Sequence, residues 1–439
     1  MTMPRTFRQL LANTLMTGVT STFLWFALTF WVYLETRSVV ATGVIGGAFA
    51  LSSAAIAPFF GTFVDRHYKK TALVLTTTAA LVCFLAAAGV YLAVDTADLL
   101  RLTSPWFWVL VGTTLLGSVA GQMRSIVLST CVTLLVPDAI RDRANGMVGT
   151  ITGFSFAITS VFSGLAIGLL GMGWSFAAAI ALTSAALVHL RRIRIPEPEP
   201  EPAETGERAW AVDIRGALDA IRAVPGLSML ILLAAFNNLV AGVFMALVDP
   251  YGLNLVSVEQ WGILWGVISL AFIAGGVLVS RRGLGPSPLR LVLAGNLVNW
   301  AACVIFPFRS SIVLLTFGMI AWLFLIPIIE AAEQTILQRS IPFERQGRVF
   351  GFAQLVENAA SPLTAFLMAP LAEAVFIPLM TTGSGADLIG GWFGTGPDRG
   401  MALMFTLAGI LGVVVTATAW ASKAYRRLSA QAAPVPEPA

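Results

Sequence analysis

The chain has 439 residues, of which 57% are apolar, 11% are charged and 10% are aromatic, with a mean hydropathy of +0.83 and a net charge of +4. An ordinary soluble domain carries roughly 25% charged residues. The composition therefore excludes an ordinary soluble protein and predicts a membrane protein. Twelve spans of about 20 residues use roughly 240 residues, which leaves enough chain for short connections, one longer loop and two tails.

Twelve apolar stretches are long enough to cross a bilayer, and they fall into two sets of six. The first set lies at about 10–34, 39–62, 71–94, 105–131, 145–170 and 172–190. The second set lies at about 226–249, 258–280, 289–308, 311–337, 347–379 and 400–424. The sequence therefore predicts an all-α membrane protein with twelve transmembrane helices in two six-helix halves.

A polar segment separates the two sets. Residues 191–210 alternate Pro with Glu and have no apolar periodicity, which is typical of a solvated linker. The stretch 212–224 has the pattern of one short amphipathic helix, and we expect it to lie on the membrane surface. The expected divisions are 1–190 for the first half, 191–225 for the linker and surface helix, 226–425 for the second half and 426–439 for the tail.

The basic residues predict the orientation of the spans. If the N-terminus is cytoplasmic, all but four of the 27 Lys and Arg residues fall on the cytoplasmic side. The exceptions are Arg37, Arg101, Arg309 and Arg399. This bias matches the positive-inside rule, and it predicts a multi-pass protein of a bacterial inner membrane with both termini in the cytoplasm.

The two halves contain an internal repeat. Residues 136–146 match residues 341–351 at an offset of 205 positions, and each segment leads into the fifth span of its half. The matching positions are Val136 with Ile341, Pro137 with Pro342, Arg143 with Arg348 and Gly146 with Gly351. Two duplicated, pseudo-symmetric halves are a transporter architecture.

The connection after the second span, residues 61–70, reads GTFVDRHYKK. This connection resembles the signature loop of the major facilitator superfamily, G-x-x-x-D-R-x-G-R/K-R/K. Tyr68 stands where the family has its second Gly, and Ser280 replaces the Asp in the corresponding loop of the second half. Within the superfamily, residues 327–351 resemble the branch of macrolide and siderophore exporters. The positions that match the signature are Gly61, Asp65, Arg66, Lys69 and Lys70.

The resemblance implies a carrier with alternating access, in which the signature loop stabilises one state. Asp65 would accept contacts from the amino end of a helix near Gly347 and Arg348, where unpaired amides favour an anion. The alternative is that the cations of the loop only set the topology and bind anionic headgroups. The gating residues implied in this way are Gly61, Asp65, Arg66, Lys69, Lys70, Arg143 and Arg348.

Charged side chains inside a span cost a few kcal/mol each, so each one indicates a function or a partner. Glu357 lies about ten residues into its span and is the first candidate proton carrier, because a low dielectric disfavours a charged carboxylate. Glu330 is the second candidate, and Glu333 lies one turn nearer to the cytoplasmic end. The alternative is structural pairing of these carboxylates with Arg124, Arg345 or Arg348.

Polar and aromatic side chains complete the expected site. Gln354, Glu357, Asn358 and Ser361 follow an i, i+3, i+4, i+7 spacing and form one stripe that should avoid lipid. The resemblance makes Asn237 and Asn238 substrate contacts, whereas we expect Asn296 and Asn299 to serve helix packing. The predicted cavity residues are Arg124, Asn237, Asn238, Gln354, Asn358, Phe26 and Phe30.

Other chemistries lack a sequence signal. No GxxxxGK[ST] motif, catalytic triad, metal-ligand spacing or CxxC pair is readable, and the small net charge gives no case for nucleic acid. The sequence therefore predicts a non-enzymatic monomer without cofactor that uses the proton gradient and whose partners are a small-molecule substrate, protons and lipids. The expected function is proton-coupled efflux of small or medium amphiphiles. The alternatives are uptake of a polar metabolite, lipid movement, and a non-transporting protein of the same fold.

Overall fold

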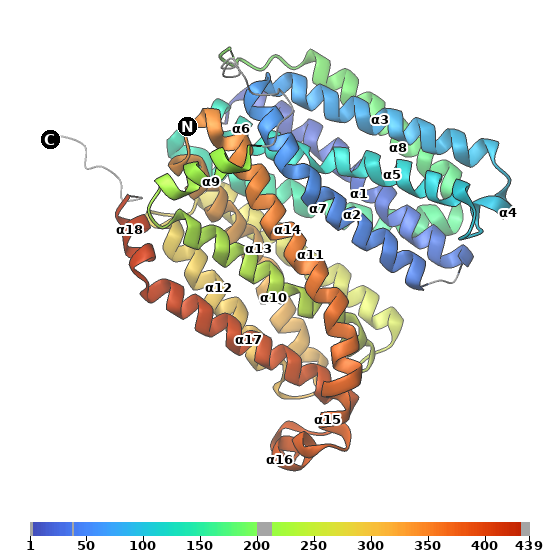
Figure 1. Ribbon diagram of the computed structural model, residues 1–439, viewed down its shortest axis with the longest axis vertical. Coiled ribbons are helices and arrows are strands. Elements are labelled where there is room, and N and C mark those ends of the chain that lie inside the picture. The colour runs from blue at the N-terminus through green and yellow to red at the C-terminus, as the bar shows by residue number, and fades with distance from the viewer. Residues whose placement is uncertain (1–2, 37–38, 200–212, 432–439) are drawn as a thin grey trace. The chain divides into compact units, whose positions relative to one another are not determined.

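The computed structural model describes residues 3–36, 39–199 and 213–431. Every regular element among these residues is a helix. Residues 200–212 of the expected linker, and the end of the expected tail from 432 onward, lie outside the described residues. The prediction of an all-helical membrane protein is confirmed (Figure 1).

The first eight α-helices precede the linker. They are α1 (Arg5–Thr36), α2 (Val39–Arg66), α3 (Lys69–Ala93), α4 (Thr96–Leu99), α5 (Pro105–Gln122), α6 (Arg124–Leu135), α7 (Arg141–Leu169) and α8 (Gly171–Arg192). A 3-10 turn, η1 (Asp138–Ile140), leads into α7.

Ten α-helices and three short helical turns follow the linker. The α-helices are α9 (Ile214–Ala223), α10 (Leu227–Leu253), α11 (Val258–Arg282), α12 (Pro288–Ile305), α13 (Ile312–Ser340), α14 (Gln346–Leu371), α15 (Ile377–Thr381), α16 (Ser384–Phe393), α17 (Pro397–Ala421) and α18 (Lys423–Gln431). The turns are η2 (Phe306–Phe308), η3 (Phe343–Arg345) and the π-helical η4 (Ala372–Phe376).

The predicted apolar stretches all fall on these helices. Within the described residues, eleven helical segments are long and apolar enough to cross a membrane. The remaining predicted stretch, 145–170, coincides with α7. One predicted span is divided into α5 and α6 at Met123, and another bends through η4 after Pro370. A proline inside a helix removes a backbone hydrogen bond, which explains an irregular turn near Pro370.

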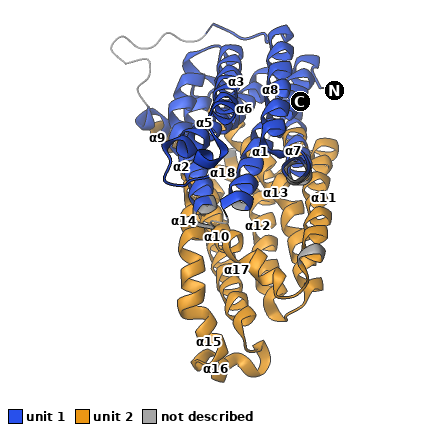
Figure 2. Cartoon of the chain, turned by 90° about the vertical axis from the view of Figure 1, so that its right-hand side faces the viewer, with its two compact units in different colours: residues 1–144, 151–217, 342–355 blue, residues 145–150, 218–341, 356–439 orange. Residues whose placement is uncertain are grey.

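The chain divides into two compact units, each with its own core (Figure 2). Unit 1 comprises Met1–Ala144, Ile151–Ala217 and Pro342–Leu355, and unit 2 comprises Asn145–Thr150, Leu218–Ile341 and Val356–Ala439. The division places the first turns of α14 in unit 1 and six residues of α7 in unit 2. Each unit therefore includes a short piece of a helix whose remainder belongs to the other unit.

Each core is built around aromatic side chains. In unit 1, Phe84, Phe107 and Phe176 are almost completely buried. In unit 2, the rings of Phe244 and Phe405 stack with their centroids 4.9 Å apart. Fully burying a large apolar side chain stabilises a soluble fold by about 1.5–3 kcal/mol, but lipid tails are as apolar as the core, so packing and hydrogen bonds weigh more here.

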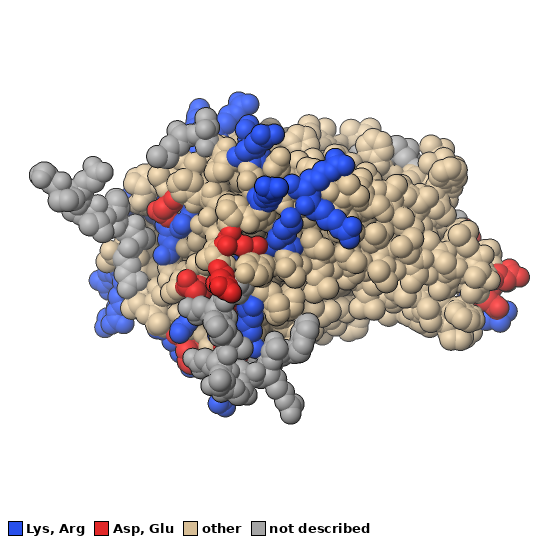
Figure 3. Space-filling model, turned by 90° about the horizontal axis from the view of Figure 1, so that it is seen from above, with Lys and Arg blue, Asp and Glu red and all other residues tan. Residues whose placement is uncertain are grey.

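The outer surface carries few charges between the helix ends. Figure 3 shows a face on which most charged side chains lie from the left end to the middle, with a small group at the right end and an uncharged area between them. Large apolar side chains such as Leu232, Phe317 and Phe366 are more than half exposed. Such a surface fits contact with lipid tails.

The helix that follows the linker forms as predicted. It is α9, and Asp213 begins it by accepting a hydrogen bond from the Gly216 amide at 2.7 Å. Ala217, Ala220 and Ile221 on its apolar side are buried within the protein. Its placement on the membrane surface stays a prediction.

A close helix contact in unit 2 joins the start of α7 to α11 and α13. A Cβ atom on Gly146 would come within 2.8 Å of Val279 and Ser280 of α11, so only glycine fits at this position. Beside it, the buried Asn145 amide donates to Thr335 Oγ1 at 2.8 Å and to Gln338 Oε1 at 2.9 Å. These bonds satisfy polar groups where no water or lipid could replace the partner.

We expect Asn145→Ala to lower the free energy of unfolding by about 1–3 kcal/mol, because it leaves buried hydrogen-bonding groups without a partner. Equilibrium unfolding of the purified protein in detergent, titrated with SDS, measures this change. Ser269→Ala is the matched control, since Ser269 is only half-buried and its hydroxyl donates within its own helix to the Gly266 carbonyl at 2.8 Å. Equal stability of the two variants would contradict the structural role of Asn145.

Candidate functional site

The signature-loop residues in unit 1 form a buried electrostatic contact at the end of α2. Asp65 lies in the last turn of α2, and its side chain is 1% exposed. Its Oδ1 accepts from the Gly347 amide at 2.6 Å, and its Oδ2 accepts from the Arg348 amide at 2.9 Å and from Arg348 Nε at 3.0 Å. Two unpaired amides of a helix amino terminus and a guanidinium therefore hold one carboxylate.

Glycines make this contact possible. A Cβ atom on Gly61 would collide with the Gly347 carbonyl, and one on Gly351 would collide with the Ala57 carbonyl. The backbones of α2 and α14 approach each other at these positions, which brings the amides of α14 within reach of Asp65. The predicted contact between Asp65 and the amino end around Gly347 and Arg348 is present in unit 1.

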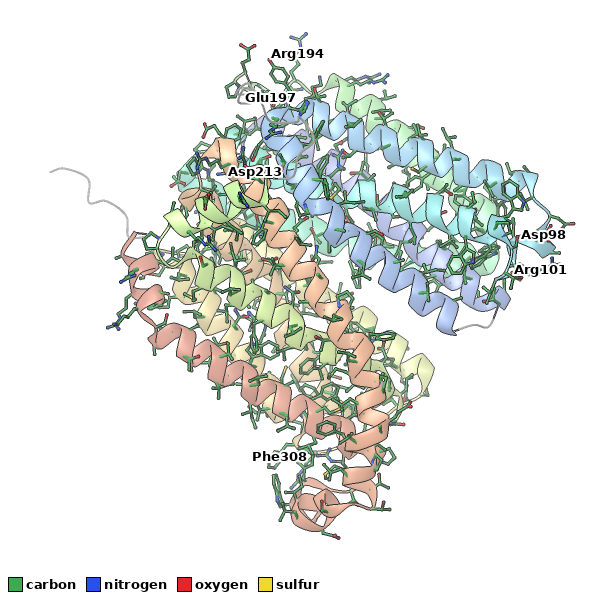
Figure 4. All side chains as sticks on the ribbon, viewed as in Figure 1. Asp98, Arg101, Arg194, Glu197, Asp213 and Phe308 are labelled. Atoms are coloured by element: carbon green, nitrogen blue, oxygen red, sulfur yellow. The ribbon has the colours of Figure 1, made fainter. Side chains whose placement is uncertain are left out.

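The two ends of the linker are bonded to the same region. Arg348 Nη1 forms a short ion pair with Asp213, directly before α9. The Glu197 carboxylate accepts hydrogen bonds from the Lys69 amide at 2.5 Å and from the Lys70 amide at 3.2 Å. It thereby caps the start of α3. In Figure 4, Arg194 and Glu197 lie at one end of unit 1, and Asp98 and Arg101 lie at the opposite end. The sequence pattern did not identify Glu197 or Asp213, because a Pro/Glu segment indicates only solvation and the polar side of an amphipathic helix indicates no particular partner.

The basic residues of the loop have different partners. Lys69 Nζ donates to the Val64 carbonyl at 2.7 Å and lies 5.0 Å from the centroid of the Phe343 ring. Lys70 Nζ donates to the Arg191 carbonyl at 3.2 Å. Tyr68 has φ −55° and ψ 131°, a conformation that any residue adopts, so the family's second glycine is dispensable here.

Arg66 and Arg143 occupy helix ends in unit 1. Arg66 is the last residue of α2, and Arg143 lies in the first turn of α7. Both side chains are partly buried. The Arg143 amide donates to Asp142 Oδ1 at 2.7 Å. The gating role of Arg66 and Arg143 stays a prediction that rests on their positions at these helix ends.

The residues of unit 2 form a partly open cavity of about 190 Å³, in which Glu330 is exposed and Glu333 is half-buried. Three helices line it, each with residues spaced i, i+3 and i+4 that share one face. From α10 come Ala234, Asn237, Asn238 and Ala241; from α12 come Asn296, Asn299 and Trp300; from α13 come Trp322, Ile326, Ile329, Glu330 and Glu333. Four predicted site residues thus meet in one cavity, namely Asn237, Asn238, Glu330 and Glu333.

The cavity also contains residues that the sequence analysis assigned elsewhere or left out. Asn296 and Asn299 are each 5% exposed, and they line the cavity instead of only packing helices. Trp300 and Trp322 were not among the predicted site residues. The available signal was the shared i, i+3, i+4 spacing on α12, which places Asn296, Asn299 and Trp300 on one helix face.

Hydrogen bonds fix part of the cavity wall. Trp300 Nε1 donates to Asn237 Oδ1 at 3.0 Å, and Asn238 Nδ2 donates to the Ala234 carbonyl at 3.1 Å. In contrast, Asn296 Nδ2 and Asn299 Oδ1 are buried and have no partner among the described residues. A buried amide atom without a partner is costly, and it indicates a place where a bound molecule supplies the missing bond.

Three carboxylates in unit 2 act on each other. Glu333 interacts electrostatically with both Glu330 and Glu357, and Glu357 also interacts with Glu330. Among the described residues, no Lys or Arg forms a salt bridge with any of the three. The alternative of structural pairing is therefore not seen in the described part of the chain. Like charges repel, and a proton or another cation relieves that repulsion.

The predicted polar stripe of α14 has two sets of contacts. Gln354 Nε2 donates to Ser125 Oγ at 2.7 Å within unit 1. Ser361 Oγ lies 3.1 Å from Met245 Sδ within unit 2. Glu357 is partly buried and Asn358 is exposed. The sequence spacing is real, but the tertiary structure gives neighbouring members of the stripe different partners.

Arg124, a predicted cavity residue, lies in the interior of unit 1 and is 3% exposed. Its Nη1 donates to Thr77 Oγ1 and its Nη2 donates to Asn13 Oδ1, both at 2.7 Å. Asn13 in turn donates to the Ala186 carbonyl at 2.7 Å and lies 3.3 Å from His189 Nδ1. A buried hydrogen-bond network therefore surrounds this guanidinium.

Phe26 and Phe30 belong to an aromatic cluster in unit 1. Their rings stack with centroids 5.9 Å apart, and Phe26 also contacts Trp25 and Phe156. Phe30 is 37% exposed. The cluster therefore offers a partly open aromatic surface. Separately, the described residues contain no group of three His, Cys, Asp or Glu side chains that could hold a metal ion.

Known structures share this architecture. A bacterial homologue of the iron transporter ferroportin in an outward-facing state is 18% identical, with 95% of this chain and 100% of that chain covered at a TM-score of 0.72. The human organic anion transporter MFSD10 is 14% identical, and the match covers 94% of this chain and 100% of that chain with a TM-score of 0.68. The proton:xylose symporter XylE is 14% identical, and the match covers 94% of this chain and 95% of that chain with a TM-score of 0.61.

Sequence comparison points to the same group. No curated protein sequence matches the chain significantly. The sequence pattern of the Major Facilitator Superfamily, however, matches residues 10–365, which is most of the chain. The fold of this superfamily has twelve helices in two halves, and its members are transporters of small-molecule substrates rather than enzymes. The chain belongs to the major facilitator superfamily and is a multi-pass membrane transporter.

Proposed function

We propose that this transporter exports small or medium amphiphilic molecules in exchange for protons. The observation that carries the proposal is the acidic cluster of unit 2, in which Glu330 and Glu333 line a cavity and Glu357 interacts with both. A scaffold has no need for three mutually repelling carboxylates without a described cationic partner. A site that exchanges protons for substrate does need them, because each bound species relieves the repulsion in turn.

The proton gradient supplies enough energy for such an exchange. One charge that moves down 100 mV releases about 2.3 kcal/mol. This corresponds to roughly a 50-fold concentration ratio for each proton. Glu357 and Glu330 are the proposed proton carriers, with Glu333 as the third member. No resident cofactor is required.

We infer that the contact at Asp65 stabilises one state of the transport cycle. The carboxylate holds two amides and the guanidinium of Arg348, and the glycines of α2 and α14 allow no side chain between the two helices. A change of state that separates the end of α2 from the start of α14 must break those bonds. Lys69, Lys70, Arg66 and Arg143 are proposed to support the contact from the surrounding helix ends.

The membrane setting follows from the sequence. The Lys and Arg bias supports an inner-membrane protein of a bacterium with both termini in the cytoplasm. The junction at residues 327–351 supports the macrolide and siderophore exporter branch. We propose that the chain works as a monomer among lipids. The partly open aromatic cluster with Phe26 and Phe30 suits flat apolar substrates.

We expect Glu357→Gln to abolish pH-gradient-driven export and Glu330→Gln to reduce it at least tenfold, because an amide cannot carry the proton. Proteoliposomes with an imposed pH gradient and a panel of fluorescent amphiphiles measure the export. Glu373→Gln is the matched control, since Glu373 is an exposed carboxylate on η4 outside the cavity. Full gradient-driven export by Glu357→Gln would remove the coupling assignment, and no export of any panel member by the wild type would remove the function.

We expect Asp65→Asn to slow substrate exchange roughly tenfold with little change in substrate affinity, because bonds to a charged group contribute about 1.5–3 kcal/mol to one state. Counterflow of a panel member across proteoliposomes measures the exchange rate. Asp138→Asn is the control, because Asp138 forms an exposed ion pair with Arg141 within the same turn. An unchanged turnover of Asp65→Asn would leave the loop with a role in topology alone.

A further inference from the structure

The cavity of unit 2 has the chemistry of a cation site. We propose that it binds the ammonium group of an organic cation, that is, a protonated or quaternary amine attached to an apolar body. The proposal rests on the proposed transport function and names the substrate class of that site. Three independent features of the cavity support it: its charge, its aromatic walls and its unpartnered amides.

The charge of the lining is purely acidic. Glu330 and Glu333 both line the cavity, and its described lining contains no Lys, Arg or His. An organic anion would meet two carboxylates without a compensating cation, which is unfavourable because like charges repel. An organic cation would instead reduce the mutual repulsion of the acidic cluster. Its binding would therefore compete with protonation of the same carboxylates.

The two tryptophans form an angled aromatic wall. The rings of Trp300 and Trp322 lie 6.3 Å apart with an interplanar angle of 54°. Trp300 is held by its bond to Asn237 and by Gly412, where any Cβ would collide with the indole. The Trp322 ring stands edge-on to Phe244 at 4.6 Å. Tryptophan faces attract ammonium groups more strongly than other side chains do, so a fixed pair suits a cation.

The amides add directional acceptors. Asn299 Oδ1 lies buried in the lining without a partner, so it can accept an N–H from an ammonium group. Asn296 Nδ2 is a buried donor of the lining without a partner among the described residues, and it suits a hydroxyl or ether on the attached body. A neutral polyol would use the amides but would leave both carboxylates without a compensating charge.

The size of the cavity limits what it holds. Pockets for drug-sized ligands measure roughly 300–1,000 Å³. At about 190 Å³, this cavity accommodates an ammonium group with one adjoining ring. The remainder of a larger substrate must extend beyond it. A metal ion is a poorer fit, because the described residues provide no cluster of three metal-ligating side chains.

Isothermal titration calorimetry on the purified full-length protein tests the proposal with benzyltrimethylammonium and benzylsulfonate, which have similar size and opposite charge. We expect saturable binding of the cation with a Kd on the order of 1 mM or tighter, and no binding of the sulfonate. The double variant Glu330→Gln/Glu333→Gln should weaken cation binding at least tenfold. Trp322→Leu should weaken it about fivefold, and Trp322→Phe should weaken it less because it keeps an aromatic face.

Glu373→Gln and Trp392→Leu are the matched controls, since both residues are exposed and lie outside the cavity. Size-exclusion profiles and helical circular dichroism show whether each variant folds, and the mild Trp322→Phe change keeps the test available if larger changes unfold the protein. Equal binding of the sulfonate, unchanged cation binding in the double variant, or no saturable cation binding would each overturn the proposal.

The binding assay needs no gradient, so it separates the two proposals. Cation binding without gradient-driven export would retain the substrate class and remove the proposed function. Gradient-driven export of neutral amphiphiles without cation binding would retain the function and remove the substrate class.

Discussion

A lipid bilayer offers no hydrogen-bond partner to a polar group, and this constraint governs the whole protein. The backbone satisfies its own hydrogen-bonding groups by forming helices throughout the spans. Buried side chains satisfy theirs by pairing inside one unit, as Arg124 does with Asn13 and Thr77, and as Asn145 does with Thr335 and Gln338. Several buried polar atoms have no partner among the described residues, and those of Asn296 and Asn299 differ from the others because they belong to residues that line the cavity of unit 2.

In both duplicated halves a glycine allows two helices to approach closely, but the polar groups at the two contacts differ. Gly351 lies in the close contact between α2 and α14, and Gly146, its counterpart in the repeat, lies in the close contact between α7 and α11. The first contact is charged, because Asp65 holds amides and a guanidinium. The second is uncharged, because Ser280 stands where the acid would be. A contact that depends on a buried carboxylate responds to charge, whereas its neutral counterpart depends on packing and on hydrogen bonds between uncharged groups such as those of Asn145.

Helical spacing explains which site residues were readable in the sequence. Glu330 and Glu333 stood out because charges are rare in spans, and the structure places both at the cavity. Asn237 and Asn238 followed from the family resemblance. Trp300 and Trp322 carried no such signal, because tryptophan is common both in cores and at membrane interfaces. Glu197 and Asp213 were equally hidden, since neither a Pro/Glu segment nor the polar side of a short amphipathic helix predicts a particular partner.

The sequence by itself determined the membrane class, the twelve apolar stretches and the repeat, because hydropathy and charge are local properties of the chain. The contact of Asp65 with the start of α14 was implied only by the family resemblance, and the structure shows it. Only the tertiary structure decided which polar residues share a cavity, since α10, α12 and α13 are distant in sequence. It also decided that Arg124 is enclosed by Asn13 and Thr77. A side chain's partners depend on how helices pack, and packing is set by many weak contacts that no single segment encodes.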